Sequence, residues 1–567
     1  MVNKILRQGS SILFKRQTNI LSAALIMMVL VLTSRFLGLW RNWFLARYFG
    51  ASGTLDAFNV AFVIPDLIAN VLITGALSVA FIPVFTTYIT KKQNHEAEDL
   101  ASTILNLVLL VYSFLAIIVF IFPLQINNML GLKLNAPFDQ QAANLMRIII
   151  FGEFFLVIGS FLTSVLQSYH RFLVAALAPV LYNAGIIFGI VVLSSPRLGF
   201  GIYGVGLGVV LGSFLHMLIQ FFALKSMGFN YRSILKLKDP DVIRILKLSL
   251  PRALGVGVGQ IEVMANVIFA SSLTIGSIAI LKFSADLQNL PIGLFGLTIA
   301  TAALPTFSAE WSAGKIEDFK KTFLNSLFQM LYLAVPVSVL LAVLRIPVVR
   351  LVLGSGLFDW PATVATATTL SLFAIGVFAQ AGFLLVTRAF YSMHDTVTPL
   401  RIAIASLIVH ISLSYYFIFI LGKNAAIPVA YLGLATSLSG MFSFFSLLFL
   451  LDRRLHKFDR KQLFYPMVKI VVPAMIMAVF LYVPLHLRLP NGEFIIDYII
   501  DTKRALNLLF LTTFVSISGF GVYVLTTWWF KSEELFSFIK MIPDLRKVTK
   551  ALELEEPVDT THSAPHI

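Results

Sequence analysis

The chain of 567 residues contains no cysteine, which excludes disulfide bonds, CxxC motifs and thiolate metal sites. Charge is also scarce, because Asp, Glu, Lys and Arg together make up only 13% of the residues. A water-soluble globular protein could not cover its surface with so few polar groups. The sequence therefore excludes a soluble fold before any motif is considered.

Motifs of catalysis are missing as well. The sequence has no phosphate-binding loop of the form G-x-x-x-x-G-K-[S/T], no H-E-x-x-H zinc motif and no recognisable pair of nucleophile and base. We therefore predict a protein that is not an enzyme, does not hydrolyse ATP and carries no cofactor or metal. Its energy source would be the membrane potential, or a coupling ion such as Na⁺ or H⁺.

Long apolar runs are what the sequence has in abundance. Hydrophobic residues make up 58% of the chain, and the mean hydropathy is +0.88. Runs of roughly 20 apolar residues recur from end to end, each long enough to cross about 30 Å of hydrocarbon as a helix and too uniformly apolar for a barrel strand. We predict an all-α, polytopic membrane protein with about fourteen transmembrane helices. The predicted spans are residues 20–47, 57–87, 100–123, 141–168, 173–195, 201–225, 245–273, 276–305, 321–345, 365–392, 398–421, 427–451, 466–486 and 506–530.

The distribution of basic residues predicts the orientation in the membrane. The chain has 43 Lys and Arg against 28 Asp and Glu, a formal net charge of +15. Most of the excess lies in alternate loops, including 91–99, 225–247 and 452–461, which is the pattern of the positive-inside rule. This pattern places both termini in the cytoplasm and explains the basic charge without nucleic acid. No cleavage site follows the first apolar run, so we expect no removed signal peptide.

Two sequence echoes suggest an internal duplication. The separation between Pro83 and Pro305 equals that between Tyr169 and Tyr391, which indicates a duplicated unit of the chain. The alternative is that the two similarities arose by chance. Two six-helix units with an even number of spans would be parallel lobes around a central cavity, which is a transporter design. The predicted parts are a basic segment 1–18, an N-terminal lobe 19–225, a cytoplasmic linker 226–247, a C-terminal lobe 248–451, a final helix pair with its loop 452–530, and a cytoplasmic tail 531–567.

Several charged residues lie inside predicted spans, where each costs about 2.5–3.5 kcal/mol unless it faces water or a partner. Arg35 and Arg41 on the first span are too far apart around the helix for one narrow stripe, but both can border a wide cavity. We predict that they bind an anion; structural ion pairs are the alternative. Glu262 on the seventh span is a candidate ion or proton site, and a partner for an arginine is the alternative. Lys282 and Asp286, one turn apart on the eighth span, either act in the site or neutralise each other.

An ordered set of motifs gives the chain a family resemblance. They read S-R-F-L-G-L-W-R (34–41), A-R-Y-F-G-A-S-G-T-L-D-A-F (46–58), V-A-F-V-I-P-D-L (60–67), G-A-L-S-V-A-F-I-P-V-F (75–85), A-P-V-L-Y-N (178–183) and F-Y-S-M-H-D-T-V-T-P (390–399). Together they resemble the MurJ/MviN-type lipid II flippases, a family of the superfamily that also exports drugs, oligosaccharidyl lipids and polysaccharides. The resemblance covers residues 20–451.

The resemblance implies a transporter that moves an undecaprenyl-pyrophosphate-linked cell-wall precursor outward across the bacterial plasma (inner) membrane. It implies that Arg35 and Arg41 bind the pyrophosphate, and Asp56 matches another functional acidic position. Asn70 and Lys282 complete the predicted substrate-binding set. The last two spans would hold the lipid tail. The expected partners are the substrate and membrane lipids, with cell-wall synthesis proteins as further candidates.

Three departures from the family pattern keep other hypotheses open. Ala69 and Asn70 stand where the family usually has two arginines, Thr74 replaces an acidic residue, and Asp286 replaces a third arginine. One alternative is an ion-coupled exporter of drugs, metabolites or polysaccharide lipids, with Glu262 and Asp286 as coupling-ion sites. The other is a transport-inactive scaffold for cell-wall enzymes.

Overall fold

The computed structural model describes residues 20–76, 81–455, 458–486 and 504–539. The predicted all-α membrane fold is confirmed, because the described ranges contain helices and no β-strand. Within them, 12 helices are long and apolar enough to cross a membrane, or up to 13 if Trp360–Ala374 and Val377–Ser392 form one span. The count of fourteen and the division into lobes stay predictions. The segment 1–18 and the tail beyond residue 539 lie outside the described residues.

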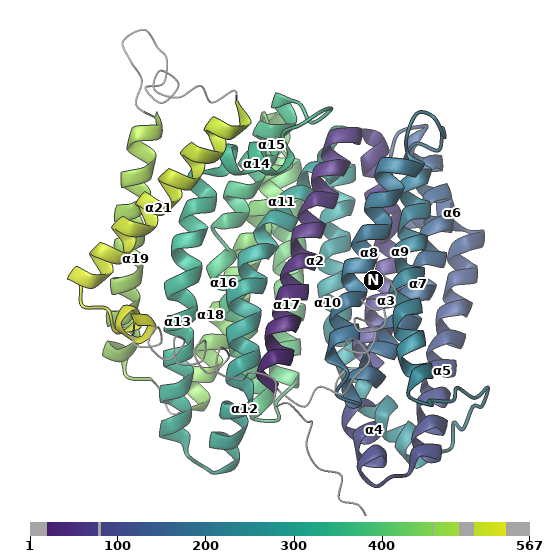
Figure 1. Cartoon of the computed structure of the whole chain (residues 1–567). Helices are drawn as coiled ribbons and strands as arrows, with labels where there is room; N and C mark the ends of the chain where they lie inside the picture. The colour runs from purple at the N-terminus through teal and green to yellow at the C-terminus, as the bar shows by residue number, and fades with distance from the viewer. Residues whose placement is uncertain (1–19, 77–80, 456–457, 487–503, 540–567) are drawn as a thin grey trace, which may run out of the picture. The chain divides into compact units, whose positions relative to one another are not determined.

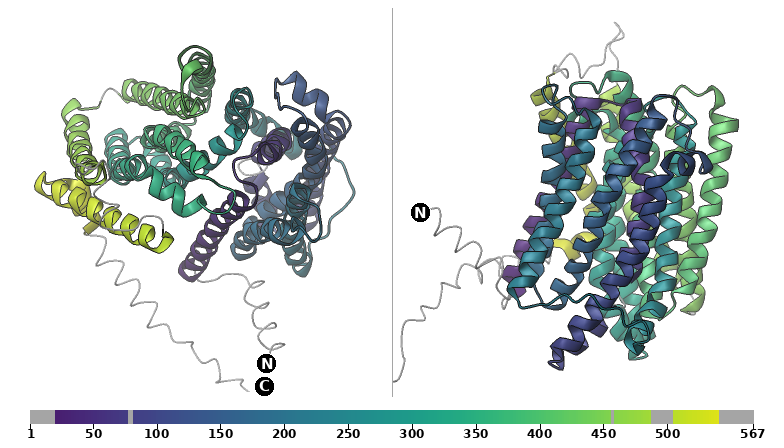
Figure 2. Two further views of the ribbon diagram at one scale, coloured as in Figure 1. Left: turned by 90° about the horizontal axis from the view of Figure 1, so that it is seen from above. Right: turned by 90° about the vertical axis from the view of Figure 1, so that its right-hand side faces the viewer.

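The helices form two compact units, of which the first contains the described residues of Met1–Leu290, Leu344–Gly376 and Asp395–Ser446. Within it, α7, α8 and α9 pack side by side, α3 packs against α7 and α10, and α2 packs against α8 (Figure 1). The right-hand view of Figure 2 shows these helices running along one common direction. The helices of the unit are α2 (Ile20–Phe49), α3 (Gly53–Ala76), α4 (Phe81–Thr90), α5 (Asn94–Ile121), α6 (Pro123–Met129), α7 (Phe138–Ser168), α8 (Phe172–Phe188), η1 (Gly189–Leu193), α9 (Ile202–Ser226), α10 (Pro240–Ser271), α11 (Ser277–Pro291), α14 (Arg345–Leu353), α15 (Trp360–Ala374), α17 (Val397–Tyr416), η3 (Phe417–Leu421), η4 (Gly422–Asn424) and most of α18 (Ala430–Arg454).

Facing glycines allow a close helix contact in this unit. Gly185 of α8 faces Gly212 of α9, and Gly189 at the start of η1 faces Gly208 of α9. The two glycines on each side are one helical turn apart. A Cβ atom on Gly185 would lie 2.4 Å from the Cα of Gly212, so no larger side chain fits without moving a backbone. Small residues at such spacing let two membrane helices approach closely where no hydrophobic driving force exists between them.

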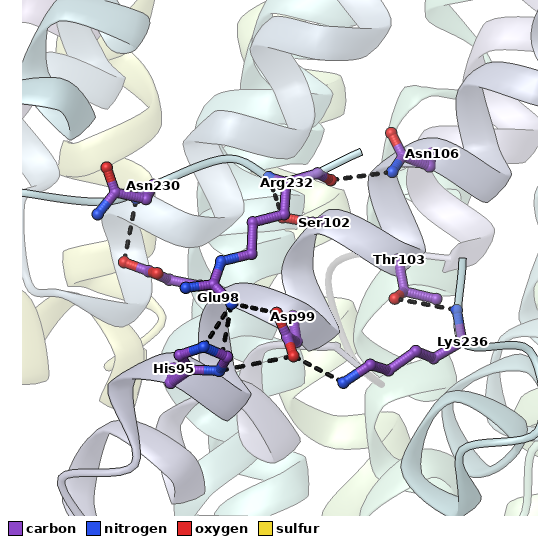
Figure 3. Close-up of polar contacts among 9 residues, drawn as sticks. All are labelled: His95, Glu98, Asp99, Ser102, Thr103, Asn106, Asn230, Arg232 and Lys236. Carbon is purple, nitrogen blue, oxygen red and sulfur yellow. Dashed lines mark hydrogen bonds and ion pairs between the residues drawn. The ribbon is translucent and has the colours of Figure 1, made fainter. Parts of the chain in front are cut away.

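The segment between α9 and α10 is held against the start of α5 (Figure 3). Glu98, Ser102 and Thr103 accept hydrogen bonds from the backbone N–H groups of this segment, and Asn106 donates to two of its carbonyls. Asp99 forms ion pairs with Arg232 at 3.3 Å and Lys236 at 2.7 Å. Because the acceptors recur every turn of α5, they form a polar ladder on one helix face. The segment from Asn230 to Lys236, within the predicted linker, is therefore an irregular stretch held against α5.

The first turn of α10 is fixed by two further contacts. The carboxylate of Asp239 caps the helix, accepting from the N–H groups of Asp241 and Val242. The hydroxyl of Tyr88 at the end of α4 donates to Asp241 at 2.5 Å. This bond, together with partial burial, raises the pKa of Tyr88 to about 12. The phenol therefore stays a donor at every physiological pH.

The second unit contains the described residues of Pro291–Val343, Val377–His394 and Leu447–Ile567. Helices α13 and α21 are joined by a buried tyrosine pair, in which the Tyr523 hydroxyl donates to the Tyr332 carbonyl at 3.1 Å. Helix α19 packs against both α13 and α21, and α16 packs against α12 and α13. The helices of this unit are η2 (Ile292–Leu297), α12 (Thr298–Ser312), α13 (Ile316–Val343), α16 (Val377–Ser392), α19 (Arg460–His486) and α21 (Ala505–Trp529).

Candidate functional site

The first unit contains a cavity of about 640 Å³ between α2, α8 and α11. Its wall carries both predicted arginines, Arg35 and Arg41, and the aspartate at position 286. Amide side chains of Asn42, Asn183 and Asn289 and of Gln167 supply the remaining strongly polar groups. The rest of the wall is mostly apolar. The lining residues are Met27, Val31, Ser34, Arg35, Gly38, Leu39, Arg41, Asn42, Gln167, Phe172, Ala175, Ala176, Pro179, Asn183, Asp286, Asn289 and Leu290.

Arg35 and Arg41 carry all of the positive side-chain charge among the described residues that line this wall. Arg35 is exposed and has no hydrogen-bond or ion-pair partner within the described part of the chain. Arg41 is half-buried and is held by neutral amide oxygens. Its Nε and Nη2 atoms donate to Oδ1 of Asn42 at 3.2 and 3.1 Å, and its Nη1 donates to Oδ1 of Asn183 at 3.4 Å. Both guanidinium charges can therefore act on a bound anion.

Asp286 is held by groups on both sides. Its Oδ2 accepts a hydrogen bond from Nδ2 of Asn42 at 3.0 Å, and its Oδ1 lies 3.4 Å from Nζ of Lys282. Lys282, a predicted substrate-binding residue, does not line the cavity. It forms an ion pair with Asp286 one turn away on α11, which is the geometry expected if the two residues neutralise each other. The net charge of the cavity wall remains positive.

Asp56 lies apart from the cavity, buried at the start of α3 with 3% of its surface exposed. Its carboxylate accepts hydrogen bonds from the N–H of Gly276 at 2.6 Å and of Ala279 at 2.8 Å. These donors open α11, whose first N–H groups have no partner inside the helix. Asp56 therefore neutralises a helix N-terminus. Gly276 has a φ of +91°, and a Cβ there would lie 2.3 Å from the Ala51 carbonyl oxygen, so the contact requires glycine.

Glu262 lies in a separate polar cluster between α10, α17 and α18. Its Oε1 is 3.8 Å from Nδ1 of His410, a fully buried histidine whose ring nitrogens also lie 3.4 Å from Ser439 and Ser414. Asn266, one turn further along α10, donates to Thr436 at 3.4 Å. Of the two ion-coupling candidates of the sequence, Asp286 lines the cavity and Glu262 does not.

Position 70 contributes nothing to the cavity wall. Asn70 is half-buried on α3, and its neighbour Ala69 is buried with 2% of its surface exposed. Neither residue lines the cavity. Four amide residues that do line it, Asn42, Gln167, Asn183 and Asn289, were not predicted as site residues from the sequence. A signal for Asn183 existed, because it ends the A-P-V-L-Y-N motif, whereas Asn42 is distinguished only by following Arg41.

The second unit has a larger cavity of about 1060 Å³ at the starts of α13 and α19. Its wall mixes lysines such as Lys320 and Lys469 with acids such as Glu317 and Glu533. Lys320 pairs with Glu317 at 2.8 Å, and Lys469 donates to the carbonyl of Lys531 at 3.0 Å. The charges of this cavity largely cancel, so the cavity of the first unit is the better anion site.

Comparison with known proteins places these features in a family. A family model described as "Lipid II flippase MurJ" matches residues 45–499. The "Probable lipid II flippase MurJ" of Bdellovibrio bacteriovorus is 31% identical over 404 residues, which are 70% of this chain and 76% of that protein. The "Lipid II flippase MurJ" of Burkholderia cenocepacia is 28% identical over 442 residues, which are 76% of this chain and 84% of that protein.

Solved structures share the fold. A structure titled "Lipid II flippase MurJ, inward closed conformation" aligns with a TM-score of 0.72 at 24% identity, covering 89% of this chain and 98% of that chain. An inward-facing multidrug resistance MATE family transporter of the MOP superfamily aligns with a TM-score of 0.64 at 15% identity, covering 76% and 98%. At these identities the likeness shows a common architecture.

Proposed function

The chain belongs to the lipid II flippase MurJ family, a family of membrane transporters, and on this premise we propose that it moves lipid II from the inner to the outer leaflet of the bacterial plasma membrane. The observation that carries the proposal is the cavity of about 640 Å³ with Arg35 and Arg41 in its wall. The substrate would be linked to its lipid by a pyrophosphate, as the family resemblance implies.

A cationic cavity lowers the free-energy cost of moving the pyrophosphate-bearing head group of the lipid through the membrane. An anion that leaves water needs fixed charges and donors to replace its hydration shell. A guanidinium offers a planar set of donors that matches phosphate oxygens. Arg35 is exposed without a partner in the described chain, and the hydrogen bonds of Arg41 go to neutral amides, so both can serve this purpose.

The membrane potential can drive the movement without ATP. The membrane potential is negative inside, so one negative charge that moves outward across the membrane gains about 2.3 kcal/mol per 100 mV. A head with roughly two negative charges would gain about 4–5 kcal/mol by moving outward. We propose that the two predicted six-helix lobes expose the cavity alternately to each side. The contact between Asp56 and the start of α11 would be one of those that such a movement breaks.

The polar cluster around Glu262 supports a second candidate, coupling to an ion within the same superfamily. Glu262 and His410 would bind a proton or Na⁺, and the cargo could then be a drug, a metabolite or a polysaccharide lipid. Ligand-induced thermal shifts of the purified chain separate the candidates. Stabilisation by undecaprenyl pyrophosphate supports the flippase, and stabilisation by Na⁺ alone supports an ion-coupled exporter.

The decisive test is rescue of a bacterial strain depleted of its own lipid II flippase. We expect the intact chain to restore growth and Arg35→Ala to abolish it at normal protein levels, because the head loses a free guanidinium. Arg197→Ala is the matched control, since Arg197 is exposed in the turn after η1 and does not line the cavity. Full rescue by Arg35→Ala would overturn the proposed role of the cavity.

A further inference from the structure

The cavity wall contains an asparagine whose two amide atoms have opposite partners. Oδ1 of Asn42 accepts from Arg41, and Nδ2 of Asn42 donates to Asp286. Arginine can only donate hydrogen bonds, and a carboxylate can only accept them. The two neighbours therefore dictate which end of the amide faces Arg41. Asn42 itself is 6% exposed, so water cannot easily take the place of either partner.

Asp286 is needed to keep the amide in this orientation. Lys282 occupies Oδ1 of Asp286, and the Asn42 amide occupies Oδ2. Without an acceptor at position 286, the amide loses the group that holds its NH₂ end. The amide is then held by Arg41 alone, and the two side chains can shift together away from this geometry. The remaining hydrogen bond that ties Arg41 to another helix is the 3.4 Å contact with Asn183.

We propose that Asp286 and Asn42 are positioning residues of the anion site. Asp286 orients the Asn42 amide, and the amide oxygen holds the guanidinium of Arg41 in the geometry that takes the pyrophosphate. This inference rests on the proposed function, because it assumes an anionic head in the cavity. It explains how a family site that usually carries an arginine at this position can work with an aspartate.

The proposal predicts an effect opposite in sign to simple electrostatics. Removal of a negative charge from a cavity wall strengthens anion binding if charge alone matters. Removal of a positioning residue weakens anion binding, because Arg41 becomes free to move and the entropy cost of fixing its side chain must be met when the anion binds. Asp286→Ala removes both the charge and the acceptor. Asp286→Asn removes the charge and keeps a carbonyl oxygen for the Asn42 amide.

The experiment measures binding of undecaprenyl pyrophosphate to the purified full chain in lipid nanodiscs by calorimetry. We expect Asp286→Ala and Asn42→Ala each to raise the Kd by about tenfold, the effect of one hydrogen bond to a charged group. Asp286→Asn should stay within about threefold of the native chain. The double variant Asn42→Ala, Asp286→Ala should bind no worse than either single variant, because both act through one pair.

The outcomes separate this inference from the proposed function. If the native chain does not bind undecaprenyl pyrophosphate, the proposed anion site fails. If the native chain binds and Asp286→Ala binds equally well or more tightly, the positioning role is overturned while the anion site stands. An equal loss of affinity in Asp286→Asn and Asp286→Ala also overturns the positioning role. The negative charge of Asp286 would then matter, and not its oxygen as a hydrogen-bond acceptor. Thermal unfolding of each variant without ligand shows whether the fold is intact.

Discussion

At the scale of single residues, Asp56 is the clearest case of a functional candidate with a structural explanation. Its carboxylate is buried and receives two backbone N–H groups at the start of α11. We expect Asp56→Ala to lower the free energy of unfolding by about 1–3 kcal/mol, because it leaves buried donors without an acceptor. Thermal unfolding of the purified chain measures the loss.

Two further variants sharpen this prediction. Asp56→Asn keeps one acceptor oxygen and should lose less stability than Asp56→Ala. Asp318→Ala removes an exposed acid whose ion pair with Lys315 is 4.0 Å long, and such pairs contribute little. Equal unfolding temperatures for Asp56→Ala and Asp318→Ala would contradict the capping role.

The residues of the candidate site were only partly predictable from the sequence. Arg35 and Arg41 stand out because a charge inside an apolar run is costly and therefore informative. The bond between Asn42 and Asp286 joins residues separated by 244 positions, and no local pattern indicates it. The position of Lys282 outside the cavity depends on how α11 is rotated, which the packing of neighbouring helices decides. Side-chain partners across helices are thus the part that the sequence leaves open.

At the scale of elements, the polar ladder on α5 holds the segment between α9 and α10, and its contribution can be tested (Figure 3). The N–H of Arg232 donates to Ser102 at 3.0 Å, and Asn106 donates to the carbonyl of Ile234 at 2.8 Å. We expect Ser102→Ala and Asn106→Ala to speed hydrogen exchange of peptides covering residues 229–237 by about tenfold, because local opening becomes easier.

The control for the ladder lies on the same helix. Ser113 lies three turns beyond Ser102 on α5 and forms no hydrogen bond within the described residues, so Ser113→Ala should leave the exchange of these peptides unchanged. Unchanged exchange in Ser102→Ala and Asn106→Ala as well would mean that the ladder does not hold the segment in solution.

The helices themselves were the most predictable elements. Each predicted range coincides with one or more described helices, because apolar runs of spanning length are a local property of the sequence. Irregularities within the ranges were not predicted. The range 276–305 lies in one continuous span whose middle, η2, is a π-helix, and the range 365–392 consists of α15 and α16, which are bent by 44° at their junction. Such irregularities depend on prolines and on neighbouring helices, which hydropathy does not report.

At the scale of the whole molecule, the absence of cysteine makes the predicted orientation easy to test. We expect a single cysteine introduced as Lys133→Cys to react with a membrane-impermeant maleimide in intact spheroplasts. A single cysteine introduced as Lys91→Cys should react only after permeabilisation, because the positive-inside rule places its loop in the cytoplasm. Both positions are exposed, so accessibility of the side chain does not limit the reaction. The reverse pattern would show an inverted chain.

The way in which Arg41 is held has a consequence for how cargo is loaded. Its hydrogen-bond acceptors Asn42 and Asn183 carry no net charge, so a phosphate that binds there breaks no direct ion pair of Arg41. The carboxylate of Asp66 acts on this guanidinium electrostatically without forming an ion pair within 4 Å. In the proposed transport cycle, release of the cargo would then depend on a conformational change or on the membrane potential, so the outward step would be the one most sensitive to a collapsed potential.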